Sequence, residues 1–215
     1  MSKHHAIAID GPAASGKSTL ARGLARRLGL IMVNSGEMYR AVTWELLRRG
    51  IDPNDRGAVV AALGEMELDC GVADGQSTIR VGGSDPGGEL RSERVNAKVS
   101  AVSAVPEVRD RLVALQRSFL DLGDVVMEGR DIGSVVFPDT PFKIYIDACE
   151  GIRSARRVAD GEQDAVASRD AADSGRSTAP LRVAEGATVL DTSDLDVGQV
   201  VESAVKVLES QGFER

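Results

Sequence analysis

The segment GPAASGKS at positions 11–18 constrains this chain more than any other feature. It fits the pattern G-x-x-x-x-G-K-[ST], in which glycines let backbone N–H groups turn toward phosphate oxygens. The lysine of the pattern reaches the outer phosphates, and its serine hydroxyl can hold Mg²⁺. The apolar run AIAI precedes the segment and an amphipathic helical pattern follows it, as such a loop requires. The segment therefore predicts a site for a nucleoside triphosphate with Mg²⁺, built on Gly11, Gly16, Lys17 and Ser18.

Short apolar runs alternate with helical patterns along the rest of the chain. Such short runs indicate buried strands. Strands that alternate with helices predict a parallel sheet that is covered on both faces. We therefore expect an α/β, three-layer fold around a five-stranded parallel sheet. The expected strands are AIAI at 6–9, IMV at 31–33, VVM at 125–127, FKIYI at 142–146 and TVL at 188–190.

The helical patterns carry residues that begin and end helices. Gly29 follows a periodic row of leucines and can end the first helix. Asn34 or Ser35 can cap the second helix, and Pro106 suits the first turn of the third. The expected helices lie at about 20–28, 36–49, 106–119 and 197–209.

Two segments break this alternation. Within 65–91, the extended stretches MELDCGV and STIRVG flank ADGQ, a candidate hairpin turn, so we expect a small inserted β element. The segment 158–178 is polar and charged, and it is interpreted as either a solvated loop or a mobile lid. The role of the arginines within it decides between the two interpretations.

The composition narrows the possible partners. The formal net charge is −7, which argues against a nucleic-acid polymer because such a partner favours a basic face. The first residues lack the apolar core of a signal peptide, and no apolar stretch approaches the ~20 residues that span a membrane. Cys70 and Cys149 have neither metal-ligand spacing nor a disulfide framework. We expect a cytoplasmic monomer that acts on small molecules and not at a membrane.

A phosphate-binding loop alone does not distinguish a GTPase switch, an ATP-driven motor and a small-molecule kinase. A GTPase needs a D-x-x-G switch and an N-K-x-D base reader. DPGG at 85–88 matches the first but lies in the β insertion, and N-K-x-D does not occur. A motor ATPase is usually larger and has an apolar run ending in an acidic pair, and the arginine in VVMEGRD is unusual for that role.

The arginines favour a kinase with a second anionic substrate. Arginine suits phosphate because its guanidinium donates in a bidentate fork. Several arginines follow strands or begin helices, and open α/β sheets bind ligands at the carboxyl ends of their strands. These are Arg40, Arg109, Arg130, Arg153, Arg156 and Arg157, with Arg169 and Arg176 in the polar segment.

Five stretches resemble the bacterial cytidylate kinases, in the order of that family. They are IAIDGPAASGKST, NSGEMYRAVTW, VSAVSAVPEVRDRLVALQR, VVMEGRDIGSVVFPD and RSTAPL, which cover most of the chain. GRDIG-x-VVFPD is the most specific, because generic P-loop proteins lack it. The resemblance implies transfer of the γ-phosphoryl group of ATP to CMP or dCMP. It also implies a core of 1–34, 92–157 and 179–215, an acceptor-binding region at 35–91 and a lid at 158–178.

The resemblance assigns roles to individual residues. ATP would contact Gly11, Pro12, Ala13, Ala14, Ser15, Gly16, Lys17, Ser18, Thr19 and Arg156, with Ser18 on Mg²⁺. The acceptor would contact Ser35, Gly36, Tyr39, Arg40, Ser100, Arg109, Arg130, Asp131, Asp173 and Arg176. Ser100 and Arg109 would read the cytosine edge. The residues acting on the transferring group would be Lys17, Arg130, Asp131, Arg169 and Arg176.

Two departures from the family pattern bear on function. The stretch between Arg157 and Arg169 is shorter than usual, which affects the reach of the lid, and Asn34 stands where the family often has aspartate. Two other functions stay open from the residues themselves. One is a kinase for another small acceptor, such as UMP, and the other is a nucleotide-dependent binding protein without turnover.

Overall fold

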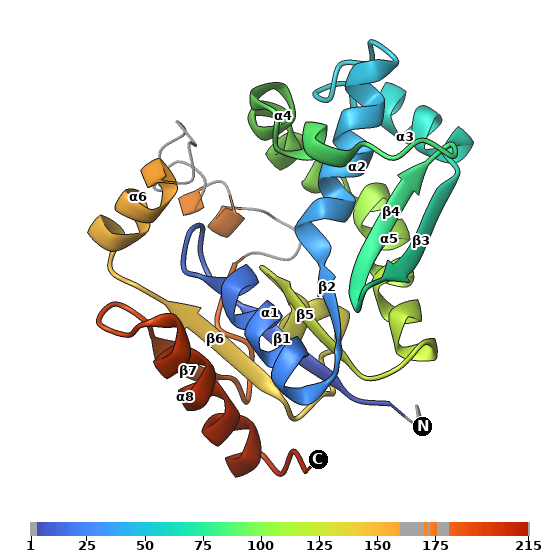
Figure 1. Ribbon diagram of the computed structural model, residues 1–215. Coiled ribbons are helices and arrows are strands. Elements are labelled where there is room, and N and C mark those ends of the chain that lie inside the picture. The colour runs from blue at the N-terminus through green and yellow to red at the C-terminus, as the bar shows by residue number, and fades with distance from the viewer. Residues whose placement is uncertain (1–3, 160–169, 172, 176–180, 215) are drawn as a thin grey trace.

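The computed structural model describes residues 4–159, 170, 171, 173–175 and 181–214. Their strands form one sheet in the order β3-β4-β2-β5-β1-β6-β7 (Figure 1). The strands are β1 (Ala6–Asp10), β2 (Ile31–Asn34), β3 (Leu68–Ala73), β4 (Gln76–Val81), β5 (Val125–Gly129), β6 (Lys143–Asp147) and β7 (Thr188–Asp191).

The parallel part of the sheet agrees with the sequence, but the strand count does not. Strands β2, β5, β1, β6 and β7 are mutually parallel and correspond to the five expected strands. The described sheet has seven strands because the inserted hairpin joins its edge, where β4 pairs with β2 at Gln76 and Met32. The insertion therefore extends the core sheet.

The hairpin itself forms where the sequence predicts it. Strands β3 and β4 are antiparallel, from Leu68 opposite Val81 to Ala73 opposite Gln76. Asp74 and Gly75 connect them, and both have positive φ angles, 51° and 73°. Asp-Gly favours such a two-residue turn because both residues tolerate this conformation.

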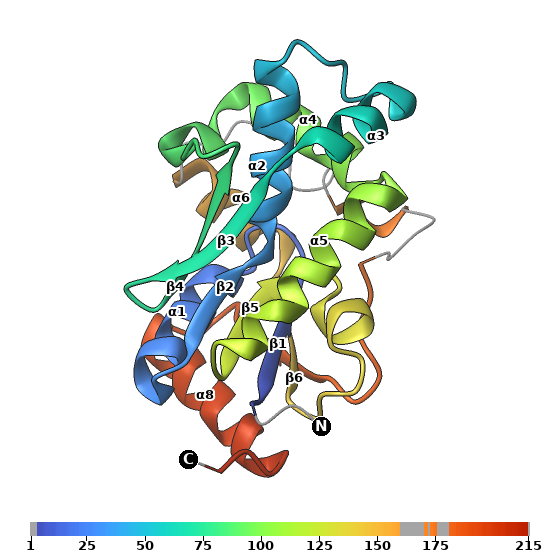
Figure 2. The same cartoon turned by 90° about the vertical axis from the view of Figure 1, so that its right-hand side faces the viewer.

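Helices cover both faces of the sheet (Figure 2). Helices α1 and α8 pack against each other on one face, and α2 and α5 lie on the other face, with α3 and α4 packed against both of them. A further helix, α6, follows β6 near the P-loop (Figure 1). The helices are α1 (Lys17–Leu28), α2 (Ser35–Arg48), α3 (Arg56–Glu65), α4 (Glu93–Ser103), α5 (Pro106–Ser118), α6 (Glu150–Ala159) and α8 (Val197–Ser210).

The two faces of the sheet contribute to separate cores. Successive side chains of a strand point to opposite faces. In β1, Ile7 and Ile9 therefore pack with α1 and α8, whereas Ala6 and Ala8 belong to the core that contains α2, α3 and α5. Because both faces are buried, β1 carries an uninterrupted apolar run.

The helix ends show why the expected boundaries were nearly correct. The Asn34 side chain accepts a 3.3 Å hydrogen bond from Glu37 N–H, so Asn34 caps α2. Gly29 ends α1 in a left-handed conformation, and Pro106 is the first residue of α5. Asn34 and Gly29 thus satisfy backbone groups that a helix leaves unpaired, and Pro106 fits the first turn because its missing N–H would have no helical partner there.

Part of the expected lid lies outside the described residues. Of the segment 158–178, the structure describes 158, 159, 170, 171 and 173–175. Arg169 and Arg176 are outside the described part. Among the residues that are described, no helix has the length and apolar character to cross a membrane.

Candidate active site

The P-loop connects the end of β1 to the start of α1. Gly11 is needed there because a Cβ at this position would lie 2.1 Å from the carbonyl oxygen of Ile146 in the neighbouring strand. Gly16 has a φ of 95°, which side chains disfavour. The two glycines of the motif thus serve packing and backbone direction, and they leave the amino end of α1 open toward the cavity.

Lys17 is buried at the base of this loop. Its Nζ donates a 2.6 Å hydrogen bond to the carbonyl oxygen of Pro12. Burial, and after it the nearby positive charge of Arg130, lower the pKa of Lys17 to about 7. A triphosphate beside Nζ would favour the protonated, positively charged form of Lys17. The buried lysine therefore suits the binding of an anion in this loop.

Ser18 links the P-loop to strand β5. Its hydroxyl donates a 2.6 Å hydrogen bond to Glu128 Oε1. The carbonyl oxygen of Glu128 accepts a 2.8 Å hydrogen bond from Ser35 Oγ, at the start of α2. Through its side chain and its carbonyl oxygen, Glu128 of β5 therefore connects the P-loop to the start of α2.

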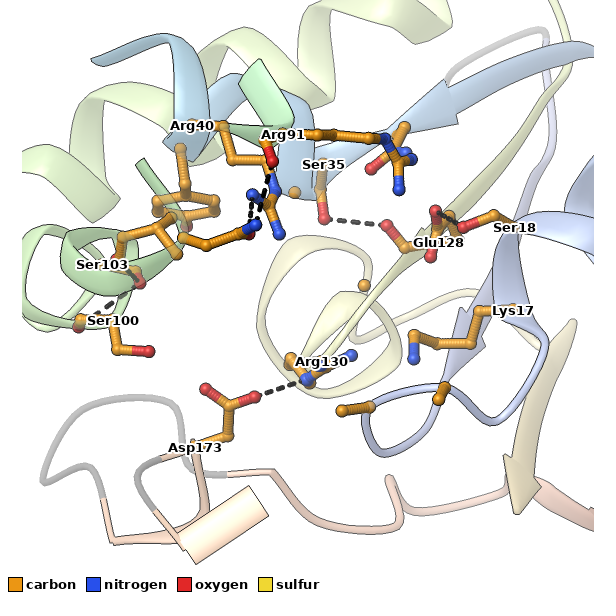
Figure 3. Close-up of a pocket in the computed structure, with 18 of the residues that line it drawn as sticks. Lys17, Ser18, Ser35, Arg40, Arg91, Ser100, Ser103, Glu128, Arg130 and Asp173 are labelled. Atoms are coloured by element: carbon orange, nitrogen blue, oxygen red, sulfur yellow. Dashed lines mark hydrogen bonds and ion pairs between the residues drawn. The ribbon is translucent and has the colours of Figure 1, made fainter. Parts of the chain in front are cut away.

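A cavity of about 1040 Å³ opens in front of these residues. Figure 3 shows Lys17 and Ser18 at one end of it, Ser100 and Ser103 at the other, and Arg130 between them. Predicted site residues that line it are Ala13, Ala14, Gly16, Lys17, Ser18, Thr19, Ser35, Gly36, Tyr39, Arg40, Ser100, Arg109, Arg130, Asp131, Arg156 and Asp173. Gly11, Pro12 and Ser15 belong to the same loop but are not part of this lining.

Arg109 and Asp131 form a buried ion pair in the wall of the cavity, between Nη2 and Oδ2. Arg109 Nη1 also donates a 3.2 Å hydrogen bond to the carbonyl oxygen of Ser103. Its guanidinium lies 5.5 Å from the ring centroid of Tyr39. Contacts on several sides fix the orientation of this arginine before any ligand arrives.

Arg130 lies between the two ends of the cavity. Its Nε donates a 2.6 Å hydrogen bond to Asp173 Oδ2, and its Nη1 donates a 3.1 Å hydrogen bond to the carbonyl oxygen of Gly11. Arg130 thus connects the segment after β5 both to the P-loop and to the described part of the expected lid.

Arg40 and Arg91 line the same side of the cavity but differ in how firmly they are held. Arg40 Nη1 donates to the carbonyl oxygen of Leu90 at 3.0 Å and to Asn96 Oδ1 at 2.5 Å. Arg91 is 60% exposed and makes a 3.8 Å ion pair with Glu37. Burial raises the pKa of Glu37, while the charge of Arg91 opposes that rise.

Two arginines of α6 hold the outer side of the P-loop. Arg156 donates to the carbonyl oxygens of Ser15 at 3.4 Å and Thr192 at 3.1 Å. Arg153 pairs with Asp170, whose carboxylate also accepts a 2.9 Å hydrogen bond from Ala13 N–H. The strand FKIYI therefore leads into a helix that supports the loop.

Sequence reasoning did not assign several residues that line the cavity. Ser103 lies one helical turn after Ser100, so the repeated VSA of this stretch was an available signal. Glu128 directly precedes the GRDIG stretch. Arg22, Arg91 and Asn96 carry no local signal, because long-range packing alone brings them to the cavity. The unassigned lining residues that carry polar side chains are Arg22, Asn34, Arg91, Glu93, Asn96, Ser103 and Glu128, and Arg157, one of the candidate arginines, also lines the cavity.

The family model for cytidylate kinase matches residues 7–210. The chain belongs to the cytidylate kinase family. It is 42% identical to the cytidylate kinase of Streptomyces avermitilis over 214 residues, which is 95% of this chain and 93% of that protein. It is 45% identical to the cytidylate kinase of Mycobacterium leprae over 207 residues, 91% of each chain.

A solved structure supports the fold independently. TT1252 from Thermus thermophilus superposes with a TM-score of 0.52 and 23% identity, covering 99% of this chain and 100% of that one. The family membership excludes the GTPase and motor interpretations, and the α/β P-loop kinase-like architecture agrees with it.

Proposed function

We propose that this chain transfers the γ-phosphoryl group of ATP to CMP or dCMP, giving ADP and CDP or dCDP. The observation that carries the proposal is one continuous cavity that joins the P-loop to the buried Arg109–Asp131 pair, with Arg130 between them. Such a cavity can hold a donor and an acceptor end to end. The relatives named cytidylate kinase give the identity of the acceptor.

At the donor end, the P-loop and Lys17 bind the triphosphate. Backbone N–H groups at the start of α1 point toward the phosphates, and the helix adds its positive end. Charged Lys17 stabilises the γ-phosphoryl oxygens as negative charge redistributes in the transition state. Arg156, which already contacts the loop, supports the donor side.

Ser18 and Glu128 fit a magnesium ion. A hydroxyl and a carboxylate 2.6 Å apart are hard oxygen ligands, and Mg²⁺ commonly uses one or two protein oxygens together with substrate phosphates. When bound, the ion would neutralise charge on the phosphate oxygens and orient them. Binding it would require the Ser18 hydroxyl to turn its hydrogen away from Glu128.

At the acceptor end, the arginines position an anionic nucleophile. A nucleotide phosphate has its second pKa near 6, so its oxygen is ionised at pH 7 and needs no general base. Arg130 and Arg40 would align the phosphate in line with the donor, while Ser100, Arg109 and Asp131 would contact the base and sugar. Catalysis then rests on alignment and charge neutralisation.

Exclusion of water completes the mechanism. Asp173 and Asp170 already join the described part of the expected lid to Arg130 and to the P-loop. Closure over the donor phosphates would keep water from replacing the acceptor. Arg169 and Arg176 would bring positive charge to the phosphates as the lid closes.

An acceptor panel tests the proposal. ADP formation is measured with ATP, Mg²⁺ and each of CMP, dCMP, UMP, AMP and GMP, and also without acceptor. We expect CMP and dCMP to give the highest kcat/KM. A higher value for another nucleotide would identify a kinase for that acceptor, and nucleotide binding without turnover would identify a binding protein.

A further inference from the structure

Asp10, the last residue of β1, makes two hydrogen bonds that the proposed mechanism does not use. Its Oδ1 accepts from Ile132 N–H at 2.7 Å, and its Oδ2 accepts from Gly133 N–H at 2.8 Å. The residue is 4% exposed. A buried carboxylate that binds two consecutive backbone N–H groups fixes the position of that backbone.

The backbone held by Asp10 directly follows Arg130 and Asp131. Residues Ile132–Val136 form a π-helical turn, and Val135 N–H donates a 2.8 Å hydrogen bond to the carbonyl oxygen of Asp131. Any shift of this turn would move the two side chains that precede it. Asp10 holds the turn at its first two residues.

The turn is closely packed around Gly133. A Cβ on Gly133 would lie 3.2 Å from Lys143 Cδ and 3.3 Å from both Ala184 Cβ and Asp10 Oδ2. The turn therefore has little room to relax if the Asp10 carboxylate changes. Burial raises the pKa of Asp10 to about 6, so the carboxylate is ionised and accepts both bonds above neutral pH.

The same residues link the two halves of the cavity. Asp10 is followed by Gly11, the first residue of the P-loop, and the carbonyl oxygen of Gly11 accepts from Arg130 Nη1 at 3.1 Å. Hydrogen bonds from Asp10 to the turn and from Arg130 to Gly11, together with the covalent chain between them, thus close a ring. This ring sets the distance between the donor loop and the acceptor arginine.

We infer that Asp10 is a positioning residue for the acceptor: through the Ile132–Gly133 backbone, it places Arg130 and Asp131 for phosphoryl transfer. The inference rests on the proposed function. It concerns a buried residue that is not part of the cavity lining.

Two variants test the inference. Asp10→Asn keeps the shape of the side chain but replaces one acceptor oxygen by an N–H₂ group, which opposes a backbone N–H. Gly133→Ala crowds the same turn, including its contact with Asp10 Oδ2, without removing the Asp10 carboxylate. Thr140→Val is the control, because Thr140 Oγ1 donates a 2.5 Å hydrogen bond to Ala6 O at the other end of β1.

The readouts are KM for CMP and kcat from steady-state rates, and Kd for ATP from calorimetry. We expect KM for CMP to rise about tenfold or more in both test variants, with a lower kcat. The Kd for ATP should change by less than about threefold. Thr140→Val should lower the melting temperature, but it should not raise KM for CMP relative to Kd for ATP.

An unchanged KM for CMP in either folded test variant would overturn the inference. Equal losses of CMP use and ATP affinity would also overturn it, because they indicate a general structural role. If Asp10→Asn does not fold, Gly133→Ala decides. Absence of CMP turnover in the unmodified chain would instead contradict the proposed function.

Discussion

Ser18 Oγ and Glu128 Oε1 lie 2.6 Å apart although 110 residues separate them in the chain. This bond places a hydroxyl from the donor loop beside a carboxylate from the central strand β5. We expect these two oxygen atoms to contribute to the Mg²⁺ site.

Ser18→Ala should raise the Mg²⁺ concentration needed for half-maximal rate and lower kcat, because one of the two proposed oxygen ligands is lost. The measurement is the rate of CMP-dependent ADP formation across a Mg²⁺ titration. Ser18→Thr keeps the hydroxyl and should restore the Mg²⁺ dependence. An unchanged Mg²⁺ dependence in Ser18→Ala would remove Ser18 from the proposed metal site.

Lys17→Ala should lower turnover by about 10²-fold to 10³-fold, because Lys17 would stabilise the transferring phosphoryl group. Circular dichroism should show a fold like that of the unmodified chain. Near-normal turnover in the folded variant would contradict the assignment of the P-loop.

Lys17 also predicts a pH effect on ATP binding. With a pKa of about 7 in the free protein, Lys17 is mostly neutral at pH 8.5, and the triphosphate should draw a proton onto it. Proton uptake on ATP binding should therefore increase from pH 6 to pH 8.5, where it approaches about one proton. Calorimetry in buffers of different ionisation enthalpy measures this uptake. Lys17→Met should abolish it, and equal uptake in both proteins would assign the proton to another group.

The same pKa has a consequence for stability. The folded-state pKa of Lys17 lies below the unfolded value of 10.5, so the unfolded chain binds more protons between pH 7 and pH 10.5. The contribution of Lys17 to the free energy of unfolding should rise with pH in that window and level off below pH 7. Comparing urea unfolding of the unmodified chain with that of Lys17→Met at several pH values isolates this contribution.

Arg130→Ala should impair acceptor use more than ATP binding, since Arg130 lies between the two ends of the cavity. KM for CMP should rise, while calorimetry should give an ATP affinity close to that of the unmodified chain. Equal loss of both would assign Arg130 a structural role.

Asp131→Ala should lower the free energy of unfolding by about 3 kcal/mol, because the charge of Arg109 stays buried after its ion pair with Asp131 is lost. Urea denaturation measures this cost. Replacing Arg109 by Met in the same variant should recover part of it, and no recovery would mean that the pair does not cause the loss.

Asp170→Ala should raise the acceptor-independent ATPase relative to the CMP-dependent rate. Asp170 joins the described part of the expected lid to Ala13 N–H and Arg153, so its loss should loosen that connection and admit water. Arg176→Ala should instead lower the CMP-dependent rate much more than the ATPase. ADP release with and without CMP distinguishes the two effects, and an unchanged ratio in both variants would contradict the account of the lid.

The sequence predicted local features better than long-range ones. The spacing of Gly11, Gly16 and Lys17 identifies a phosphate loop because each residue has a backbone or charge requirement of its own. The helix α3 was not expected: its buried Val59, Ala62 and Leu63 lie among other small apolar residues, so no polar face marks it.

Residues far apart in sequence explain most of what was missed. Nothing in the local pattern at Arg40 indicates that Asn96 and Leu90 hold its guanidinium. The pairing of Met32 with Gln76, which adds the hairpin to the sheet, is likewise a relation between distant segments. Patterns of three to four residues cannot encode such partners, so the cavity wall around Arg91 was recognised only in the structure.

The attachment of the hairpin to the sheet edge has a consequence for how proteins of this kind can vary. Its outer strand β3 lies at the end of the sheet order, and β4 and β2 separate it from β5, whose residues Glu128 and Gly129 line the cavity. Additional residues at this edge would lengthen a backbone ladder and leave the spacing between donor and acceptor unaltered. Changes in the length of β3 should therefore be tolerated during evolution, and a fluorescent label attached to β3 should leave the rate of CMP phosphorylation unchanged.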